Sequence, residues 1–304
     1  MPENDGGSNH SVARRVAPFA PLALGLLLSR AIIPGQPSAP GTEAPTDVAA
    51  AHCDEVTDFL DCHSRYPTGC SQAAQYDAYL NLLKNQLIPP AGAEPVRFLT
   101  LNDFEGFDHQ TPAGLNPRMK NHVEFKDDLA RLGEGNIFAV IGYLYYAQRT
   151  GAESSNCQLA RDDYEGTNVD YHVGIGFDAD VAANLRTNPQ SRRSQQKALS
   201  QSSIVVEMTP HFRYHFENGK WTNENLQKVV GRQVKVVGQL LNDSEHNLPG
   251  QNCAIAASSQ EKLSCWRASA WELHPVTQFL VCNNASQSCG PNSTDWAELD
   301  QVKP

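Results

Sequence analysis

Seven acidic and histidine residues, in or beside strand-like segments, are the side chains of this sequence best suited to chemistry. They are Asp170, His172, Glu207, Asp243, His246, Glu272 and His274. Imidazoles with nearby carboxylates suit Zn²⁺ or Mn²⁺ and leave a coordination position for water. We therefore predict a divalent metal bound by His172, His246 and His274, with Glu207 as the general base that activates the water.

A structural role for the same residues is the alternative. The sequence contains no H-E-x-x-H run and no compact spacing of metal ligands. A histidine next to a proline, such as His274, often only hydrogen-bonds its neighbours, and an outward-facing glutamate such as Glu207 is usually solvated or paired. The G-x-S-x-G, P-loop and G-x-G-x-x-G motifs of other enzyme classes are also missing. Ligand binding and structural hydrogen bonding therefore both stay open.

Five strand-like segments and one helix-like segment must position these residues. The strands are expected at 137–146, 169–177, 204–209, 234–241 and 271–282, and the helix at 223–230, with Thr222 as its N-cap. The order strand, strand, strand, helix, strand, strand is that of the five-stranded OB barrel. We therefore predict a mainly β protein built on an OB-like barrel, with an N-terminal helical, Cys-rich elaboration.

The alternation of apolar and polar residues decides which side chains face out of this barrel. Along 169–177 the apolar residues point inward, while Asp170 and His172 point outward. Glu207 is the outward residue of the third strand. Pro275 predicts a bulge or an edge position in the fifth strand, and Gly238 marks a bend in the fourth.

The long connections define the expected ligand cleft. In OB barrels the loops at 147–168 and 242–270 would border it. A third connection, 184–203, carries four basic residues and no acid. We expect a solvated loop there, with contact to an anionic partner as the alternative. Tyr171 and Trp271 should pack in the core, so neither offers an obvious stacking platform for bases.

The chain divides into three parts. Residues 1–51 are expected to be a signal or anchor segment with a Pro/Ala-rich linker, because two arginines precede a short apolar stretch. Residues 52–135 form the Cys-rich elaboration, with a helix at 72–87 and a short strand at 96–101. Residues 136–304 form the barrel domain with a C-terminal tail. We expect an exported protein, periplasmic or extracellular, without a membrane span in its mature chain. An uncleaved N-terminal anchor is the alternative.

Eight cysteines support export, because disulfides persist only in oxidising compartments. None forms a C-x-x-C pair, which argues against a zinc ribbon or a thioredoxin-like site. Their connectivity does not follow from the sequence. We expect Cys253 to pair with Cys265 and Cys282 with Cys289, while Cys157 ties the barrel to the N-terminal cysteines.

Net charge narrows the range of partners. The formal net charge of −10 counts against nonspecific binding to nucleic acid, which depends on Lys and Arg neutralising phosphates. A small molecule, a saccharide or a protein remains as the expected partner.

Four short motifs carry a resemblance to other proteins. They are D-Y-H at Asp170, V-E-M at Val206, D-x-x-H at Asp243 and E-L-H-P-V at Glu272. Over residues 137–282 the chain resembles a group of bacterial exported proteins of uncharacterised function, whose members look like small OB-type barrels. The resemblance implies the fold and the grouping of these polar residues, and no reaction.

Three functions fit the sequence. The first is an exported binding module whose ligand sits at the barrel mouth. The second is a metal-dependent hydrolase, acting on phosphodiesters for example, which predicts a bound metal. The third is a structural envelope-interaction protein, which predicts an exposed apolar patch and no converging polar pocket.

Overall fold

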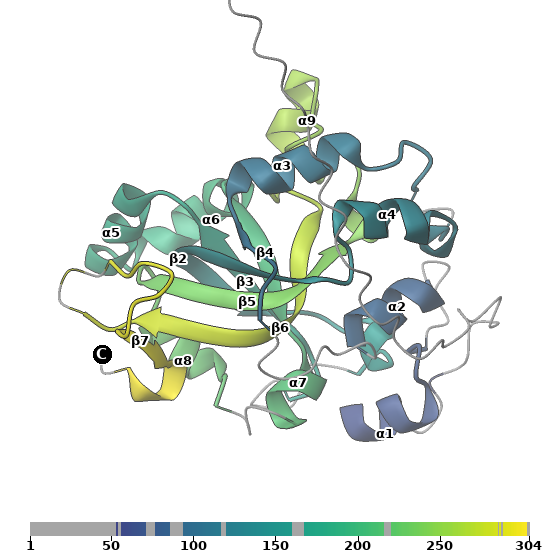
Figure 1. The fold of residues 1–304 in the computed structure, drawn as a ribbon, viewed down its shortest axis with the longest axis horizontal. Helices are drawn as coiled ribbons and strands as arrows, with labels where there is room; N and C mark the ends of the chain where they lie inside the picture. The colour runs from purple at the N-terminus through teal and green to yellow at the C-terminus, as the bar shows by residue number, and fades with distance from the viewer. Residues whose placement is uncertain are drawn as a thin grey trace, which may run out of the picture. The chain divides into compact units, whose positions relative to one another are not determined.

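Five strands close into a barrel in the computed structural model of this chain (Figure 1). They are β2 (Ile137–Arg149), β3 (Tyr171–Gly176), β4 (Ser203–Met208), β5 (Gln233–Asn242) and β6 (Trp271–Cys282). The order around the barrel is β2-β3-β4-β6-β5, and β5 pairs back onto β2. Only the β4–β6 pair among these is parallel. The predicted five-stranded OB-like barrel is therefore confirmed.

Two short strands extend the barrel sheet. β1 (Phe98–Leu99) runs parallel to β2, and β7 (Trp296–Glu298) runs antiparallel to β6. The structure describes residues 53, 56–70, 77–85, 94–116, 120–159, 167–215, 220–284, 286 and 288–302. All of them belong to one compact unit, residues 44–304. The predicted signal or anchor segment, residues 1–51, lies outside the described residues.

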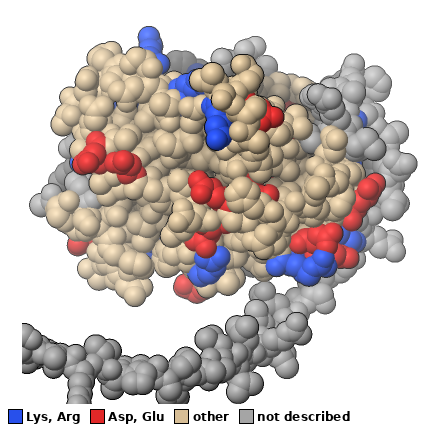
Figure 2. Space-filling view, turned by 90° about the horizontal axis from the view of Figure 1, so that it is seen from above, with Lys and Arg blue, Asp and Glu red and all other residues tan. Residues whose placement is uncertain are grey.

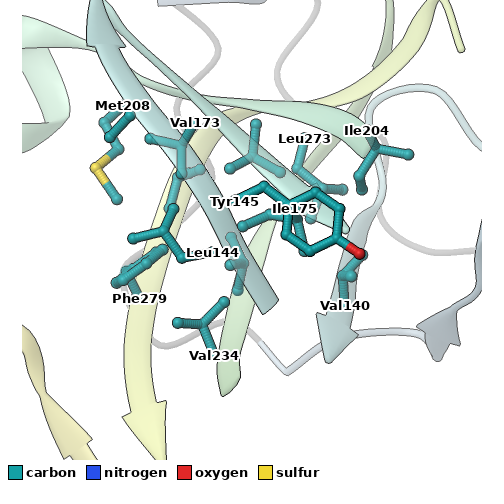
Figure 3. Close-up of a cluster of buried hydrophobic side chains, with 14 of the residues drawn as sticks. Val140, Leu144, Tyr145, Val173, Ile175, Ile204, Met208, Val234, Leu273 and Phe279 are labelled. Atoms are coloured by element: carbon teal, nitrogen blue, oxygen red, sulfur yellow. The ribbon is translucent and has the colours of Figure 1, made fainter. Parts of the chain in front are cut away.

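Apolar side chains from all five barrel strands fill the interior. Figure 3 shows this core, and its labelled members include Leu144 of β2, Val173 of β3, Ile204 of β4, Val234 of β5 and Phe279 of β6. Each of the five is fully buried. The predicted core positions of Tyr171 and Trp271 are also confirmed, since both rings are at most 1% exposed. Neither ring is free to stack on a ligand.

Two glycines on the outward side of β3 make room for tyrosine rings. A Cβ atom at Gly174 would lie 2.1 Å from the ring of Tyr146, and one at Gly176 would lie 1.9 Å from the ring of Tyr145. These contacts explain why the strand alternates between apolar residues and glycine. They also leave Asp170 and His172 as the polar residues on this side.

Residues 179–201, between β3 and β4, form two helices. α5 (Ala179–Thr187) begins after Asp178, whose side chain accepts hydrogen bonds from the backbone N–H groups of the first turn. α6 (Ser191–Gln201) follows it. The solvated loop predicted for 184–203 is therefore wrong. The helices bury few apolar side chains, chiefly Leu185 and Leu199, so the sequence shows no clear helical period.

The remaining elements cover the outside of the barrel or connect its strands. They are α1 (Phe59–Arg65), α2 (Ala78–Asn85), α3 (Leu101–Gln110), η1 (His122–Phe125), α4 (Lys126–Leu132), η2 (Ser154–Asn156), α7 (Pro210–His215), α8 (Asn223–Lys228), η3 (Ser244–His246), α9 (Ser259–Ser264) and η4 (Leu299–Gln301). In Figure 1, α5 and α6 lie on the left, while α1, α2 and α4 lie on the right.

The helix predicted between the third and fourth strands is present as α8. The side chain of Thr222 caps it by accepting a hydrogen bond from the N–H of Asn225, as the sequence predicted. The predicted helix at 72–87 corresponds to α2, although residues 72–76 and 86–87 lie outside the described part. The strand predicted at 96–101 is shorter, because Thr100 caps α3 and ends the extended segment.

β6 bends where Pro275 interrupts it. The register between β5 and β6 shifts on both sides of Gly238, which confirms the predicted bulge and bend. A Cβ atom at Gly238 would lie 2.8 Å from the carbonyl oxygen of Pro275, so only glycine allows this close approach. The bend lies directly after Glu272 and His274.

All eight cysteines form disulfides. The predicted pairs Cys253–Cys265 and Cys282–Cys289 are confirmed. Cys157 pairs with Cys62, which confirms the predicted link between the barrel and the N-terminal cysteines. Cys53 pairs with Cys70.

On the face seen in Figure 2, charged side chains form small groups, several of mixed sign, on a largely uncharged surface. Within the described part of the chain, no helix has both the length and the apolar character that crossing a membrane requires.

A buried carboxylate in α3 gives a test of pH-dependent stability. Asp108 accepts hydrogen bonds from the side chain of Asn252 and the backbone N–H of Ala270, but burial still raises its pKa from 3.8 to about 6. The folded protein therefore holds the Asp108 proton more tightly than the unfolded chain. This group's contribution to the free energy of unfolding falls as pH rises from 3.8 to 6.

We expect Asp108→Asn to remove that pH dependence. Two pKa units correspond to about 3 kcal/mol. Relative to the wild type, the variant should therefore gain about that much stability between pH 4 and pH 7. Urea unfolding of both proteins across this range measures the difference. Parallel pH profiles would contradict the prediction.

Candidate functional site

A cavity of about 600 Å³ lies at one end of the barrel. The loop after β2 contributes Glu153, and the loop between β5 and β6 contributes His246 and Trp266. The two long connections therefore border a cleft, as predicted. α2 forms a third wall, which was not predicted, and contributes Lys84.

His172 and Glu207 meet inside this cavity because they are paired across adjacent strands. His172 of β3 lies directly opposite Glu207 of β4, on the outward face of both strands. His172 Nε2 is 2.8 Å from Glu207 Oε1 and 3.9 Å from Glu153 Oε1. We call Glu153, His172 and Glu207 the open cluster, because His172 and Glu153 keep 19% and 23% of their side-chain surface exposed.

A second group of side chains shares Glu207 with the open cluster and is buried throughout. Asp170, Glu207 and His274 are each at most 1% exposed, and we call them the closed cluster. His274 Nδ1 hydrogen-bonds Glu272 Oε1 at 3.0 Å and lies 3.2 Å from Glu207 Oε2. His274 Nε2 lies 3.9 Å from Asp170 Oδ2. The sequence predicted an outward Glu207, but other side chains bury it.

Arg267 hydrogen-bonds the two predicted acids that belong to neither cluster, Asp243 and Glu272. Its guanidinium donates to Asp243 Oδ2 at 2.9 Å and to Glu272 Oε2 at 2.5 Å. Lys84 Nζ approaches Asp243 Oδ1 at 3.7 Å. His246 Nδ1 lies 2.5 Å from Asp243 Oδ2. All of these partners except His246 are nearly excluded from solvent.

These contacts divide the buried carboxylates into two kinds. Burial alone would raise the pKa of Asp243, but His246, Lys84 and Arg267 together hold it well below its usual value. In contrast, burial and the charge of Glu272 raise the pKa of Glu207 well above its usual value. Asp243 therefore has enough cationic partners, and Glu207 does not.

Asp170 behaves like Glu207. Burial, with a contribution from Glu153, raises the pKa of Asp170 to about 6. Burial alone would lower the pKa of His274, but the surrounding acids, chiefly Glu207 and Glu272, raise it. All three groups of the closed cluster therefore hold protons more tightly than usual, and the same environment attracts another cation.

Three groups of side chains in the described part of the chain have atoms close enough to hold a metal ion. They are the open cluster, the closed cluster and a group formed by Glu207, Asp243 and Glu272. Arg267 already lies between the two acids Asp243 and Glu272, so the third group has an internal cation.

The seven residues singled out in the sequence do gather at this end of the barrel, but in different groups. His172 belongs to the open cluster, His274 to the closed cluster, and His246 pairs with Asp243. Glu153, Lys84 and Arg267 were not among the residues predicted from the sequence. Glu153 and Arg267 lie in loops and Lys84 lies in α2. No local sequence pattern indicates that these residues lie near the barrel mouth.

Comparison with known proteins leaves the family open. No family model and no solved structure matches this chain. The chain is similar to the glucosamine-6-phosphate deaminases of two strains of Bacteroides fragilis, with 24% identity over 230 residues. The similarity covers 72% of this chain and 76% of each deaminase.

Proposed function

We propose that this protein is a divalent-metal-dependent hydrolase whose metal is bound by Glu153, His172 and Glu207. The observation that carries the proposal is the convergence of one imidazole and two carboxylates on a water-accessible cavity. Such a ligand set suits Zn²⁺ or Mn²⁺. The cavity leaves room for a bound water and a substrate beside the ion, as a catalytic site requires.

His246 is the acid–base group of this proposal. The Asp243 carboxylate lies 2.5 Å from its Nδ1, which orients the imidazole, and the ring lines the same cavity. An ion held by Glu153, His172 and Glu207 would supply Lewis-acid activation of a water, and His246 would accept the proton of that water and give it to the leaving group. This role differs from the three-histidine metal site that we expected from the sequence.

Metal content tests the proposal first. We expect protein from an oxidising compartment, without a histidine tag, to bind Zn²⁺ or Mn²⁺ at the open cluster. His172→Ala should remove that ion, whereas Glu245→Gln, which changes a carboxylate in the same cavity, should not. Elemental analysis after dialysis measures the difference. A wild-type protein without metal after incubation with both ions would contradict the proposal.

Turnover then separates a hydrolase from a binding module. A panel of chromogenic esters, including p-nitrophenyl acetate and bis-p-nitrophenyl phosphate, should be cleaved only by the metal-loaded protein. His246→Ala should retain the metal but lose about 100-fold or more in rate, the usual contribution of an acid–base group. A protein that binds metal but cleaves no member of the panel would instead be the binding module.

The similarity to deaminases favours a second candidate, the removal of an amino group from an amino sugar. Four carboxylates, those of Glu153, Glu207, Asp243 and Glu245, line the cavity beside two basic residues, Lys84 and Arg149. The excess of acids attracts a protonated amine more strongly than a phosphate. Release of ammonia from glucosamine and from glucosamine 6-phosphate tests this candidate. We expect the unphosphorylated sugar to react faster if the candidate is correct.

The exposed apolar residues give little support to a structural envelope protein. Leu60, Val96, Phe98 and Leu263 are the large apolar side chains most exposed in the described part; Leu60 lies in α1 and Leu263 in α9, and only Val96 and Phe98 are near each other in the sequence. The converging polar cavity also points to a ligand. We further propose export to an oxidising compartment, because four disulfides would not persist in a reducing one.

A further inference from the structure

Glu207 faces a different histidine with each of its two carboxylate oxygens. Oε1 lies 2.8 Å from His172 Nε2 in the open cluster. Oε2 lies 3.2 Å from His274 Nδ1 on the buried side. One carboxylate therefore forms the wall between the cavity and the closed cluster.

The closed cluster contains polar atoms with no hydrogen-bond partner in the described part of the chain. Asp170 Oδ2, Glu207 Oε2 and His274 Nε2 are all buried and make no hydrogen bond, although His274 Nδ1 lies 3.2 Å from Glu207 Oε2. Leaving such atoms unsatisfied costs about 1–3 kcal/mol each. Three of them in one place indicate that a further group belongs between them.

The hydrogen bond of His274 favours a cation as that group. Nδ1 hydrogen-bonds Glu272, so Nε2 is the nitrogen available to a ligand, and this carboxylate–histidine arrangement is common at metal sites. The 3.9 Å gap between Nε2 and Asp170 Oδ2 is too long for a hydrogen bond. It lies within the span of two metal–ligand bonds of about 2 Å each.

We propose that the closed cluster binds a second divalent cation, so that Glu207 bridges two metal ions. The proposal rests on the proposed function, which places the first ion in the open cluster. Paired ions about 3.5–4 Å apart are a known arrangement in hydrolases, where they bind both the attacking and the leaving oxygen. The buried ion would have Asp170 and His274 as its own ligands.

Metal stoichiometry in four variants tests the second ion. We expect two equivalents of Mn²⁺ or Zn²⁺ in the wild type, one in Asp170→Asn, one in His172→Ala and none in Glu207→Gln. Asp108→Asn is the matched control, because Asp108 is also a buried carboxylate with a raised pKa but lies outside both clusters. It should keep two. Circular dichroism and thermal unfolding show whether each variant folds.

The outcomes separate the two proposals. One equivalent in the wild type, lost in His172→Ala and kept in Asp170→Asn, would overturn the second ion and leave the open site standing. A proton would then occupy the closed cluster. If the wild type binds one equivalent and only Asp170→Asn loses it, the open site and the bridging role of Glu207 are both overturned. No bound metal would overturn both.

Electron paramagnetic resonance of the wild type keeps the test independent of variant folding. Two Mn²⁺ ions bridged by one carboxylate should give an exchange-coupled spectrum at two equivalents. A spectrum of isolated Mn²⁺ at the same loading would overturn the bridging role of Glu207.

Discussion

Replacing Arg267 by methionine is expected to lower the free energy of unfolding by about 3–5 kcal/mol, the usual cost of removing one partner from a buried charge pair. The guanidinium is 1% exposed and hydrogen-bonds both Asp243 and Glu272. Methionine can fill much of the space but provides no donors. The two carboxylates would then be buried with less compensating charge, or would have to take up protons.

Chemical denaturation at pH 7 measures this loss. Arg131→Met is the matched control, because Arg131 pairs with Asp128 on the surface, where ion pairs contribute about 1 kcal/mol or less. Arg267→Lys should fall between the wild type and Arg267→Met, since lysine keeps the charge but not the two-pronged geometry. A loss below 1 kcal/mol in Arg267→Met would show that the buried acids do not depend on this cation.

Removing the Cys62–Cys157 disulfide is expected to have the second large effect on stability. The paired cysteines are separated by 95 residues, so the bond restricts a long loop in the unfolded chain. Loop-closure entropy predicts a loss of about 4–5 kcal/mol for the double variant Cys62→Ser/Cys157→Ser. Metal affinity should fall as well, because Cys157 directly follows η2 (Ser154–Asn156), the segment next to Glu153.

The Cys282–Cys289 bond provides the comparison. Its cysteines are only 7 residues apart, and the same loop-closure argument predicts a loss of about 2–3 kcal/mol. This bond lies at the end of β6, away from the cavity-lining residues, so its removal should leave metal binding unchanged. Thermal or urea unfolding of both double variants, with metal titration, measures the contrast. Equal losses of stability would contradict the loop-length argument.

The barrel could be predicted because its strands are short apolar segments and one of them, β3, alternates clearly. β3 alternates between buried apolar residues and glycines or polar residues, and such a period is visible in a single sequence. The helix α8 was predictable for a local reason too, since Thr222 caps it. The helices α5 and α6 were not predicted, because their stability depends on packing against the barrel rather than on a strong amphipathic pattern.

The short-range disulfides were also predictable, because Cys253–Cys265 and Cys282–Cys289 are neighbours in the sequence. The link from Cys157 to the N-terminal region was expected, but only the fold identifies Cys62 as its partner.

By itself, the sequence determined the barrel order, the outward direction of Asp170, His172 and Glu207, and their place near the loops of the barrel mouth. Strand alternation sets the direction of each side chain, and it is a local property. Only the tertiary structure decided how these residues are grouped. Arg267 and Glu153 reach the site from loops distant in the sequence, and burial, which depends on every surrounding element, separates the compensated acids from those that attract a cation.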